Sequence, residues 1–247
     1  MSGDRPGTLF GVGLGPGDPE LVTLKAARVI AAAPVVAHFR KRGRPGHARA
    51  IASALIPASA KETSFEYPVT VEIDFHEDAY VGAIREFYGA CAETLRRELD
   101  EGRDVALLCE GDPFFYGSFL HMYDRIKTSC PVVVIPGVTG MSGCWTAAAA
   151  PITYGDDVLS VLPGTLGREA LAAQLKSADA AVIMKVGRNL DKIRGALADA
   201  GRLDDAIYVE RGTMPGEKVM PLTALGDAAA PYFSIILAPG GRGRRIR

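Results

Sequence analysis

The sequence has few cysteines, almost no net charge and no long unbroken apolar run, and each shortage excludes a class of protein. Its four cysteines include no C-x-x-C pair, which indicates neither a zinc site nor a disulfide framework and suits a reducing cytoplasm. A formal net charge of −1 gives no electrostatic reason to expect nucleic acid or a membrane as partner. The uncharged stretch 128–155 is interrupted by prolines and glycines, so it does not predict a membrane span.

Two further absences concern targeting and metals. Residues 1–7 lack the apolar core of a signal peptide. The histidines at 38, 47, 76 and 121 lack the spacing of metal ligands, so we expect no metal. With 247 residues, of which 48% are apolar, the chain suits one or two globular domains.

What the sequence does have is a glycine-rich stretch near its start, residues 11–20, between an apolar strand pattern and a helical pattern. This layout is typical of a nucleotide or cofactor loop. The dinucleotide fingerprint is excluded, because Pro16 stands where a third glycine is needed and lacks a backbone N–H. Asp18 followed by Pro19 indicates a capped helix start. The capping carboxylate occupies the N–H groups and puts a negative charge where a phosphate would bind, which disfavours a phosphate there. A tight structural turn and a contact with a ligand other than phosphate both remain open.

The hydrophobic periodicity predicts alternating strands and helices along the whole chain. Expected strands are 8–12, 34–37, 62–71, 104–108, 132–135, 158–162, 180–184, 207–210, 218–220 and 233–237. Expected helices are 19–33, 47–56, 76–101, 118–127, 141–149, 168–177 and 189–200, and a basic loop is expected at 38–46. The pattern of expected strands and helices changes near 136–140. We therefore predict an N-terminal domain of residues 1–138 and a C-terminal domain of residues 139–247.

Two more glycine-and-proline loops follow expected strands, at 109–117 and 136–140. In open α/β sheets, ligands sit outside the carboxyl ends of the strands. Three such loops in one half of the chain therefore predict one shared site.

Five motifs in order give the chain a resemblance to the tetrapyrrole (uroporphyrinogen/precorrin) methylases. They are Gly13-x-Gly15-Pro16-Gly17-Asp18 with Thr23-Leu24-Lys25, Gly111-Asp112-Pro113-x-x-Tyr116-Gly117, Pro136-Gly137-Val138-Thr139, Met184-Lys185-x-Gly187 and Val209-Glu210-Arg211-Gly212. Residues 109–118 and 232–235 are most similar to members that methylate precorrin-2 at C-20 in cobalamin synthesis, giving precorrin-3A.

The resemblance implies an α/β fold of two αβα domains with a cofactor cleft between them, and usually a homodimer. It also implies S-adenosylmethionine as methyl donor. The cofactor contacts that it carries over are Pro16, Glu110, Gly111, Asp112, Phe115, Thr139, Gly140, Met184 and Gly212. The sulfonium and ammonium groups of this cofactor suit Asp112 and backbone carbonyls, and no phosphate has to be bound.

The catalytic residue stays open. Siroheme-forming relatives carry an aspartate, proposed as a base, at the position that aligns with Phe39. The phenylalanine therefore disfavours the interpretation of this chain as a uroporphyrinogen methylase. Candidate proton acceptors in the second motif are Glu110, Asp112, Tyr116 and His121, and none is preferred. A lone histidine such as His121 is more often structural.

The expected substrate is a tetrapyrrole with acetate and propionate arms. Basic residues at the edge of the expected cleft could bind these arms, or could form a solvated loop; they are Arg40, Lys41, Arg42, Arg44 and Arg49. Alternatives are a corrin-pathway methylase acting at another ring carbon or on a cobalt-bearing substrate, and a non-catalytic tetrapyrrole carrier. Related folds methylate RNA, which the near-neutral charge disfavours. A nicotinamide-dependent oxidoreductase would need the dinucleotide loop that is excluded above.

Overall fold

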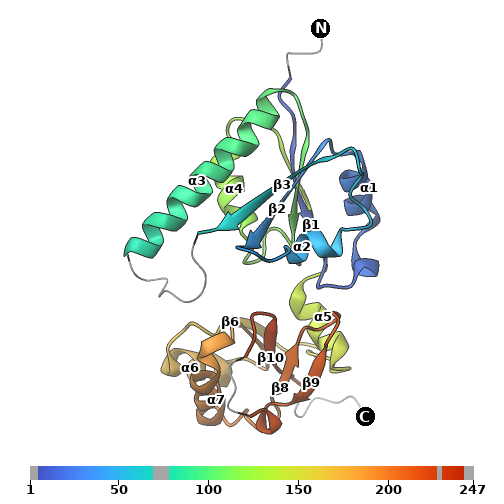
Figure 1. The fold of residues 1–247 in the computed structure, drawn as a ribbon. Coiled ribbons are helices and arrows are strands. Elements are labelled where there is room, and N and C mark those ends of the chain that lie inside the picture. Colours follow the sequence, from blue (N-terminus) through green and yellow to red (C-terminus); the bar gives the residue numbers. More distant parts are fainter. Residues whose placement is uncertain (1–4, 69–77, 227–229, 242–247) are drawn as a thin grey trace. The chain divides into compact units, whose positions relative to one another are not determined.

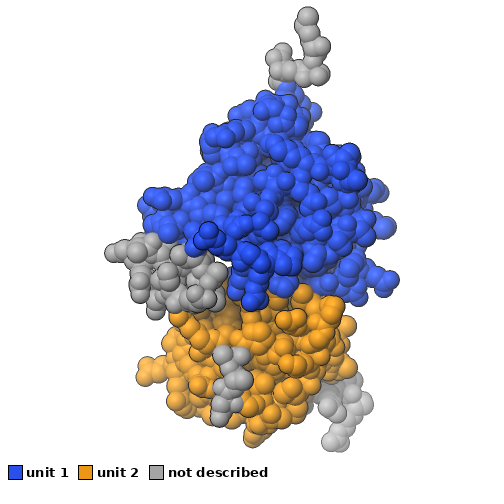
Figure 2. All heavy atoms as spheres, viewed as in Figure 1, with its two compact units in different colours: residues 1–139 blue, residues 140–247 orange. Residues whose placement is uncertain are grey.

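The computed structural model describes residues 5–68, 78–226 and 230–241, with the backbone alone for residues 78–81. The chain divides into two compact units, residues 1–139 and 140–247 (Figure 2). Each unit holds a five-stranded sheet with helices on both of its faces (Figure 1). This confirms the α/β class and the αβα layering that the family resemblance implies.

The sheet of the first unit is entirely parallel, with the strand order β3-β2-β4-β1-β5. Its strands are β1 (Leu9–Gly13), β2 (Val35–Lys41), β3 (Lys61–Tyr67), β4 (Val105–Cys109) and β5 (Val132–Ile135). All five residues of β4 are buried, as expected for an apolar strand inside a sheet that is covered on both faces.

Among the described residues of this unit, four α-helices cover the sheet. One face carries α1 (Leu24–Ala32) and α2 (His47–Ile51), and the other carries α3 (Asp78–Asp100) and α4 (Phe119–Ile126). The predicted apolar stripe of the long helix packs against the sheet; its described members are Ile84, Phe87, Cys91, Leu95 and Leu99. Residues 76 and 77 and the side chain of Tyr80, also part of that prediction, lie outside the described residues.

The predicted helix 19–33 is wrong as one element. Asp18 caps only a 3₁₀ turn, η1 (Pro19–Leu21), by accepting from the backbone N–H of Glu20. The chain is extended at Val22, and α1 then begins with its own cap, because the Thr23 hydroxyl accepts from the N–H of Ala26.

The predicted loop 38–46 is also too long, because β2 continues to Lys41. The register pairs Arg40 with Glu66 and Lys41 with Tyr67, which keeps these basic residues on a strand. The helix predicted at 47–56 ends at Ile51, where the hydrogen bonds change to a tighter pattern of turns. Residues 69–71 of the strand predicted at 62–71 lie outside the described residues.

The second unit has the strand order β6-β7-β10-β8-β9. Its strands are β6 (Leu159–Pro163), β7 (Ala180–Met184), β8 (Ile207–Glu210), β9 (Lys218–Pro221) and β10 (Ser234–Ala238). Strand β6 is parallel to β7, and β10 is antiparallel to both β7 and β8. The carboxyl ends of β6, β7 and β8 therefore lie at one edge of this sheet.

The second sheet carries α5 (Gly140–Ala147) on one face and α6 (Arg168–Ser177) and α7 (Leu190–Asp199) on the other. This unit also has two short 3₁₀ turns, η2 (Gly187–Asn189) and η3 (Leu222–Ala224). Among the helices of the described ranges, none combines the length and apolar character that crossing a bilayer requires.

Candidate functional site

In the first unit, the three glycine-rich loops follow three adjacent strands, β4, β1 and β5. Since these strands are parallel, the loops that begin after Cys109, Gly13 and Ile135 leave the sheet at the same edge. The three loops therefore gather at the edge where open α/β sheets bind ligands, and the shared site that they are expected to form stays a prediction.

The loops pack against one another so closely that side chains are excluded. A Cβ atom on Gly13 would lie 2.6 Å from the backbone nitrogen of Gly137 and 2.8 Å from the carbonyl oxygen of Gly111. A Cβ atom on Gly137 would collide with the same Gly111 carbonyl. Backbone atoms cannot rotate away, so contact between the loops requires glycine at 13 and 137.

Backbone hydrogen bonds between the first two loops use the N–H groups that a phosphate would need. The N–H of Gly111 donates to the carbonyl of Gly15 at 2.8 Å, and the N–H of Leu14 donates to the carbonyl of Cys109 at 2.9 Å. Gly15 has a φ of +79°, which favours glycine there. The geometry supports the exclusion of a dinucleotide phosphate.

The carboxylate of Asp112 ties the second loop to the third. Its Oδ1 accepts from the backbone N–H of Phe114 at 2.9 Å, and its Oδ2 accepts from the N–H of Gly137 at 3.1 Å. A carboxylate oxygen has two acceptor sites, so these bonds leave capacity to face a cation.

Three aromatic residues follow Asp112 in the second loop, Phe114, Phe115 and Tyr116. The rings of Phe115 and Tyr116 meet edge to face, with their centroids 4.9 Å apart. Tyr116 has a φ of +55°, a strained value for a non-glycine residue, and its surface is 47% exposed. Strain of this kind favours a functional reason for the loop conformation.

The basic residues between the end of β2 and α2 separate into paired and exposed ones. Arg40 pairs with Glu66 at 2.5 Å, and Arg49 forms a two-pronged pair with Glu62 at 2.9 and 3.1 Å. Glu62 thus holds the guanidinium of Arg49 in place. The hydrogen bond from Arg49 is the main reason that the pKa of Glu62 is lowered.

Arg42 and Arg44 lie in an exposed turn, which we call the basic turn and define as residues 41–46. The N–H of Arg44 donates to the carbonyl of Lys41, and Gly43 between them has a φ of +68°. Within the described residues, neither Arg42 nor Arg44 forms an ion pair. Both guanidinium groups are therefore available to an anionic ligand.

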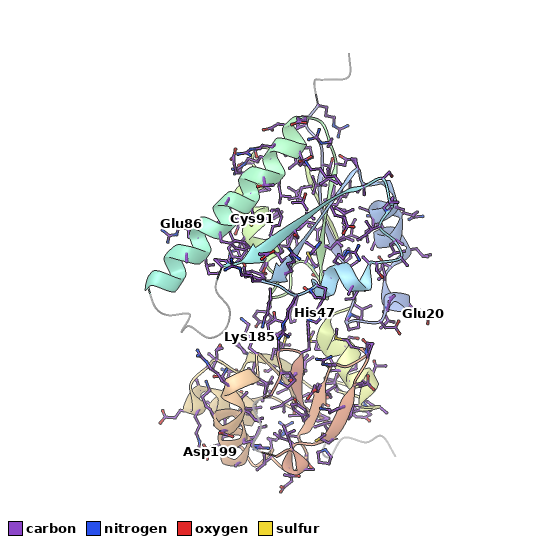
Figure 3. All side chains as sticks on the ribbon, viewed as in Figure 1. Glu20, His47, Glu86, Cys91, Lys185 and Asp199 are labelled. Atoms are coloured by element: carbon purple, nitrogen blue, oxygen red, sulfur yellow. The ribbon has the colours of Figure 1, made fainter. Side chains whose placement is uncertain are left out.

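Glu110 connects the second loop to the helix after this turn. Its Oε1 accepts from the backbone N–H of Ala48 at 3.0 Å, near the start of α2 that His47 marks in Figure 3. The sequence offered no signal for this contact, because the two residues are 62 positions apart.

Of the proton acceptors considered, His121 has a structural contact. Its ring stacks on Tyr88, with centroids 4.1 Å apart, and burial followed by the charge of Arg125 lowers its pKa. Phe39, at the position of the missing aspartate, packs among aromatic rings, including that of Tyr67 at 5.6 Å. No acceptor is singled out by this geometry.

A hydroxyl cluster that sequence reasoning missed anchors the end of the second loop. Ser118 Oγ lies 2.5 Å from the hydroxyl of Tyr67 and 3.0 Å from that of Tyr88. These residues come from β3, α3 and the start of α4. Only their shared tertiary position reveals the cluster, because their spacing in the sequence has no pattern.

In the second unit, the expected cofactor residues lie near strained loops. Met184 ends β7 and Gly212 follows β8. Left-handed backbone occurs at Lys185, labelled in Figure 3, and at Arg211 and Thr213, with φ values of +57°, +53° and +67°. Within the described ranges, all but one of the non-glycine residues with positive φ lie in the family motifs or directly beside them.

Gly212 packs directly on α5, the helix that Gly140 begins. A Cβ atom on Gly212 would lie 2.9 Å from the sulfur of Cys144, so the loop approaches the helix closely. Burial raises the pKa of Cys144 to about 12, which keeps its thiol protonated and unreactive.

Glu210, before Gly212, is held by its neighbours. Its Oε2 accepts from the hydroxyl of Tyr208 at 3.1 Å, and its Oε1 lies 3.2 Å from Nζ of Lys218. The motif glutamate therefore supports the loop after β8.

The expected cofactor residues thus form two sets. Within the first unit, Pro16, Glu110, Gly111, Asp112 and Phe115 occupy two bonded loops, and Thr139 ends the third. Within the second unit, Gly140 and Gly212 are joined through α5, and Met184 lies at the end of β7. No group of three or more His, Cys, Asp or Glu side chains among the described residues could hold a metal ion.

Comparisons with known proteins agree with the motifs. The model of the Tetrapyrrole (Corrin/Porphyrin) Methylases matches residues 8–228. A precorrin-2 C(20)-methyltransferase of a Sinorhizobium species is 52% identical over 99% of this chain and 100% of its own length. The cobalamin biosynthesis protein CobIJ of Mycobacterium tuberculosis is 47% identical over 97% of this chain, which spans 47% of that protein.

The fold also matches a solved structure. The crystal structure of a cobalt precorrin-4 methyltransferase, CbiF, superposes with a TM-score of 0.70 over 94% of each chain, at 23% identity.

Proposed function

The chain belongs to the tetrapyrrole (corrin/porphyrin) methylases, and from that premise we propose that it methylates precorrin-2 at C-20, giving precorrin-3A in cobalamin biosynthesis. The methyl donor is S-adenosylmethionine. The observation that carries the proposal is the 52% identity, over both full lengths, to a precorrin-2 C(20)-methyltransferase.

The loops of the first unit fit a cofactor without phosphate. The N–H groups of Leu14 and Gly111 donate to carbonyls of the facing loop, while the Asp112 carboxylate offers a negative charge. We assign cofactor contacts to Pro16, Glu110, Gly111, Asp112, Phe115 and Thr139 of the first unit, and to Gly140, Met184 and Gly212 of the second. The contact assigned to Glu110 is made by its backbone, because its side chain is bonded to Ala48. When bound, the cofactor supplies a methyl group that its sulfonium has already activated.

The remaining catalytic requirement is positioning, since the leaving group is already activated. The protein has to hold C-20 at about 3–3.5 Å from the methyl carbon, in line with the bond that breaks. We propose that Arg42 and Arg44 bind carboxylate arms of the macrocycle, with Arg40 as a weaker candidate because Glu66 holds it. A proton must then leave C-20, and its acceptor is not assigned.

We further propose that the enzyme is a cytoplasmic homodimer without a metal cofactor, acting on a small tetrapyrrole and not on nucleic acid or at a membrane. The alternative is a methylase of the same pathway that acts at another ring carbon or on a cobalt-bearing substrate.

Anaerobic incubation with precorrin-2 and methyl-labelled S-adenosylmethionine, read by mass spectrometry, tests the reaction. The expected result is one labelled methyl group per macrocycle. Cobalt-precorrin-2 and uroporphyrinogen III serve as competing substrates, and faster transfer to either would contradict the proposal. Binding of the macrocycle without any methyl transfer would support a tetrapyrrole carrier.

A further inference from the structure

The side chain of Glu110 leaves its own loop and contacts another segment. Its backbone belongs to the second glycine-rich loop, whereas its Oε1 accepts from the N–H of Ala48 at 3.0 Å. Ala48 is the second residue of α2. The N–H groups of a first helical turn have no partner within the helix, so an acceptor there stabilises the helix start.

Helix α2 needs this acceptor from elsewhere, because its own cap residue cannot supply one. Gly46 is the cap residue and has no side chain. A Cβ atom there would lie 2.7 Å from Nδ1 of His38 and 2.8 Å from the carbonyl oxygen of Phe39. A capping serine or aspartate is therefore excluded at position 46. The helix has five residues, too few to be stable without outside contacts.

The basic turn joins β2 at one end to α2 at the other. On one side it leaves β2, where Lys41 is paired in register with Tyr67 of β3. On the other side it enters α2 through Gly46. The orientation of Arg42 and Arg44 therefore depends on how firmly the start of α2 is held.

We propose that Glu110 is a positioning residue for the substrate. It presents its backbone to the cofactor loop and, through its side chain, holds the basic turn so that Arg42 and Arg44 meet the carboxylate arms of the macrocycle. The proposal rests on the proposed function, because it takes a tetrapyrrole carboxylate as the ligand of the turn.

If Glu110 acted only through its charge, its removal would change the substrate KM in the opposite direction, so the direction of the change distinguishes the two roles. Removing a negative charge near a site for an anionic substrate would strengthen binding, so Glu110→Ala and Glu110→Gln would both lower the substrate KM. Positioning predicts that Glu110→Ala raises the substrate KM. Glu110→Gln keeps an oxygen acceptor for Ala48, so its KM should stay close to that of the parent protein.

The first experiment needs no activity. Hydrogen exchange of peptides covering residues 41–52 is measured in the parent protein, Glu110→Ala, Glu110→Gln and Glu86→Ala. Glu86, labelled in Figure 3, is an exposed α3 residue whose side chain forms no hydrogen bond or ion pair in the described part of the chain, and it serves as the matched charge control. Faster exchange in Glu110→Ala alone is expected, and unchanged exchange would overturn the proposal.

The second experiment measures steady-state kinetics. Glu110→Ala should raise the substrate KM about three- to tenfold, in line with the loss of a helix cap, while the Kd for S-adenosylmethionine stays within about twofold. A changed cofactor Kd with an unchanged substrate KM would overturn the proposal and place the side chain in the cofactor site. If the parent protein transfers no methyl group, the proposed function fails, and substrate positioning fails with it.

A mutant cycle shows whether Glu110 acts through the turn. In the Arg42→Ala/Arg44→Ala background, Glu110→Ala should have little further effect on the substrate KM. The same fold-change in both backgrounds would show independent action and overturn the proposal.

Discussion

The Asp112 carboxylate joins two loops of the first unit, because its Oδ2 accepts from the backbone N–H of Gly137 at 3.1 Å. Its Oδ1 meanwhile accepts from Phe114 within the second loop. One side chain thus fixes the positions of two loops to which we assign cofactor contacts.

Replacing Asp112 should weaken cofactor binding and the fold together. Asp112→Ala leaves two backbone N–H groups without their acceptor, which should cost about 1–3 kcal/mol of unfolding free energy. We expect the Kd for S-adenosylhomocysteine to rise about tenfold by calorimetry. Asp112→Asn keeps one acceptor oxygen, so its stability and its Kd should lie between those of the parent protein and of Asp112→Ala. Unchanged affinity in both variants would remove Asp112 from the cofactor site.

Gly137→Ala should be destabilising because the new Cβ meets the carbonyl of Gly111, which cannot move aside. We expect a loss of about 2 kcal/mol or more, measured by denaturant unfolding, together with weaker cofactor binding. Gly89→Ala on α3 is the matched control, since nothing in the described structure lies within 4 Å of its Cβ. It should be neutral or stabilising. Equal effects of both changes would contradict the loop packing.

Much of the fold follows from hydrophobic periodicity, because strands and helices that bury one face leave a repeating pattern. The predicted strands 132–135, 180–184 and 207–210 match β5, β7 and β8 residue for residue. The hydrophobic pattern does not predict the ends of elements that are set by a few polar contacts. Thr23, rather than Asp18, starts α1, and pairing with β3 extends β2 through Lys41.

The site is less predictable than the fold. The glycine motifs placed the three loops correctly, yet they did not show that Gly13 and Gly137 are needed for contact between loops. The bond from Ala48 to Glu110 joins residues 62 positions apart, and its physical reason lies in the space around Gly46. Such relationships depend on tertiary packing, which a single sequence does not encode in any local spacing.

Arg42→Ala and Arg44→Ala should raise the KM for the tetrapyrrole without changing affinity for S-adenosylmethionine. Each guanidinium is exposed and can pair with a carboxylate arm, so each loss should cost about three- to tenfold in KM. Arg168→Ala, which removes an exposed ion pair with Asp199 in the second unit, is the control. An unchanged KM in both turn variants would leave the basic turn as a solvated loop.

Glu98 should make the first unit sensitive to acid. It is buried, and hydrogen bonding to Lys61, followed by Arg103, lowers its pKa from the ordinary value of 4.5. A carboxyl whose pKa is lower in the folded state stabilises the protein above its unfolded pKa. That stability is lost as the pH falls through the lower folded pKa.

Glu98→Gln should therefore flatten the acid limb of the stability curve and lower stability at neutral pH by about 1–2 kcal/mol. Unfolding followed from pH 2 to pH 7 measures both effects. Glu93→Gln, which removes an exposed pair with Arg96, should leave the curve within about 0.5 kcal/mol of the parent. Parallel curves for the parent protein and Glu98→Gln would contradict the assignment.

The most direct test of the proposed function is the position of the transferred methyl group. Precorrin-2 is incubated anaerobically with carbon-13 methyl-labelled S-adenosylmethionine, and the product is examined by NMR. We predict a single labelled methyl group bonded to C-20. A label on another ring carbon would show a different methylase of the pathway, and bound cofactor without any transfer would contradict catalysis on precorrin-2.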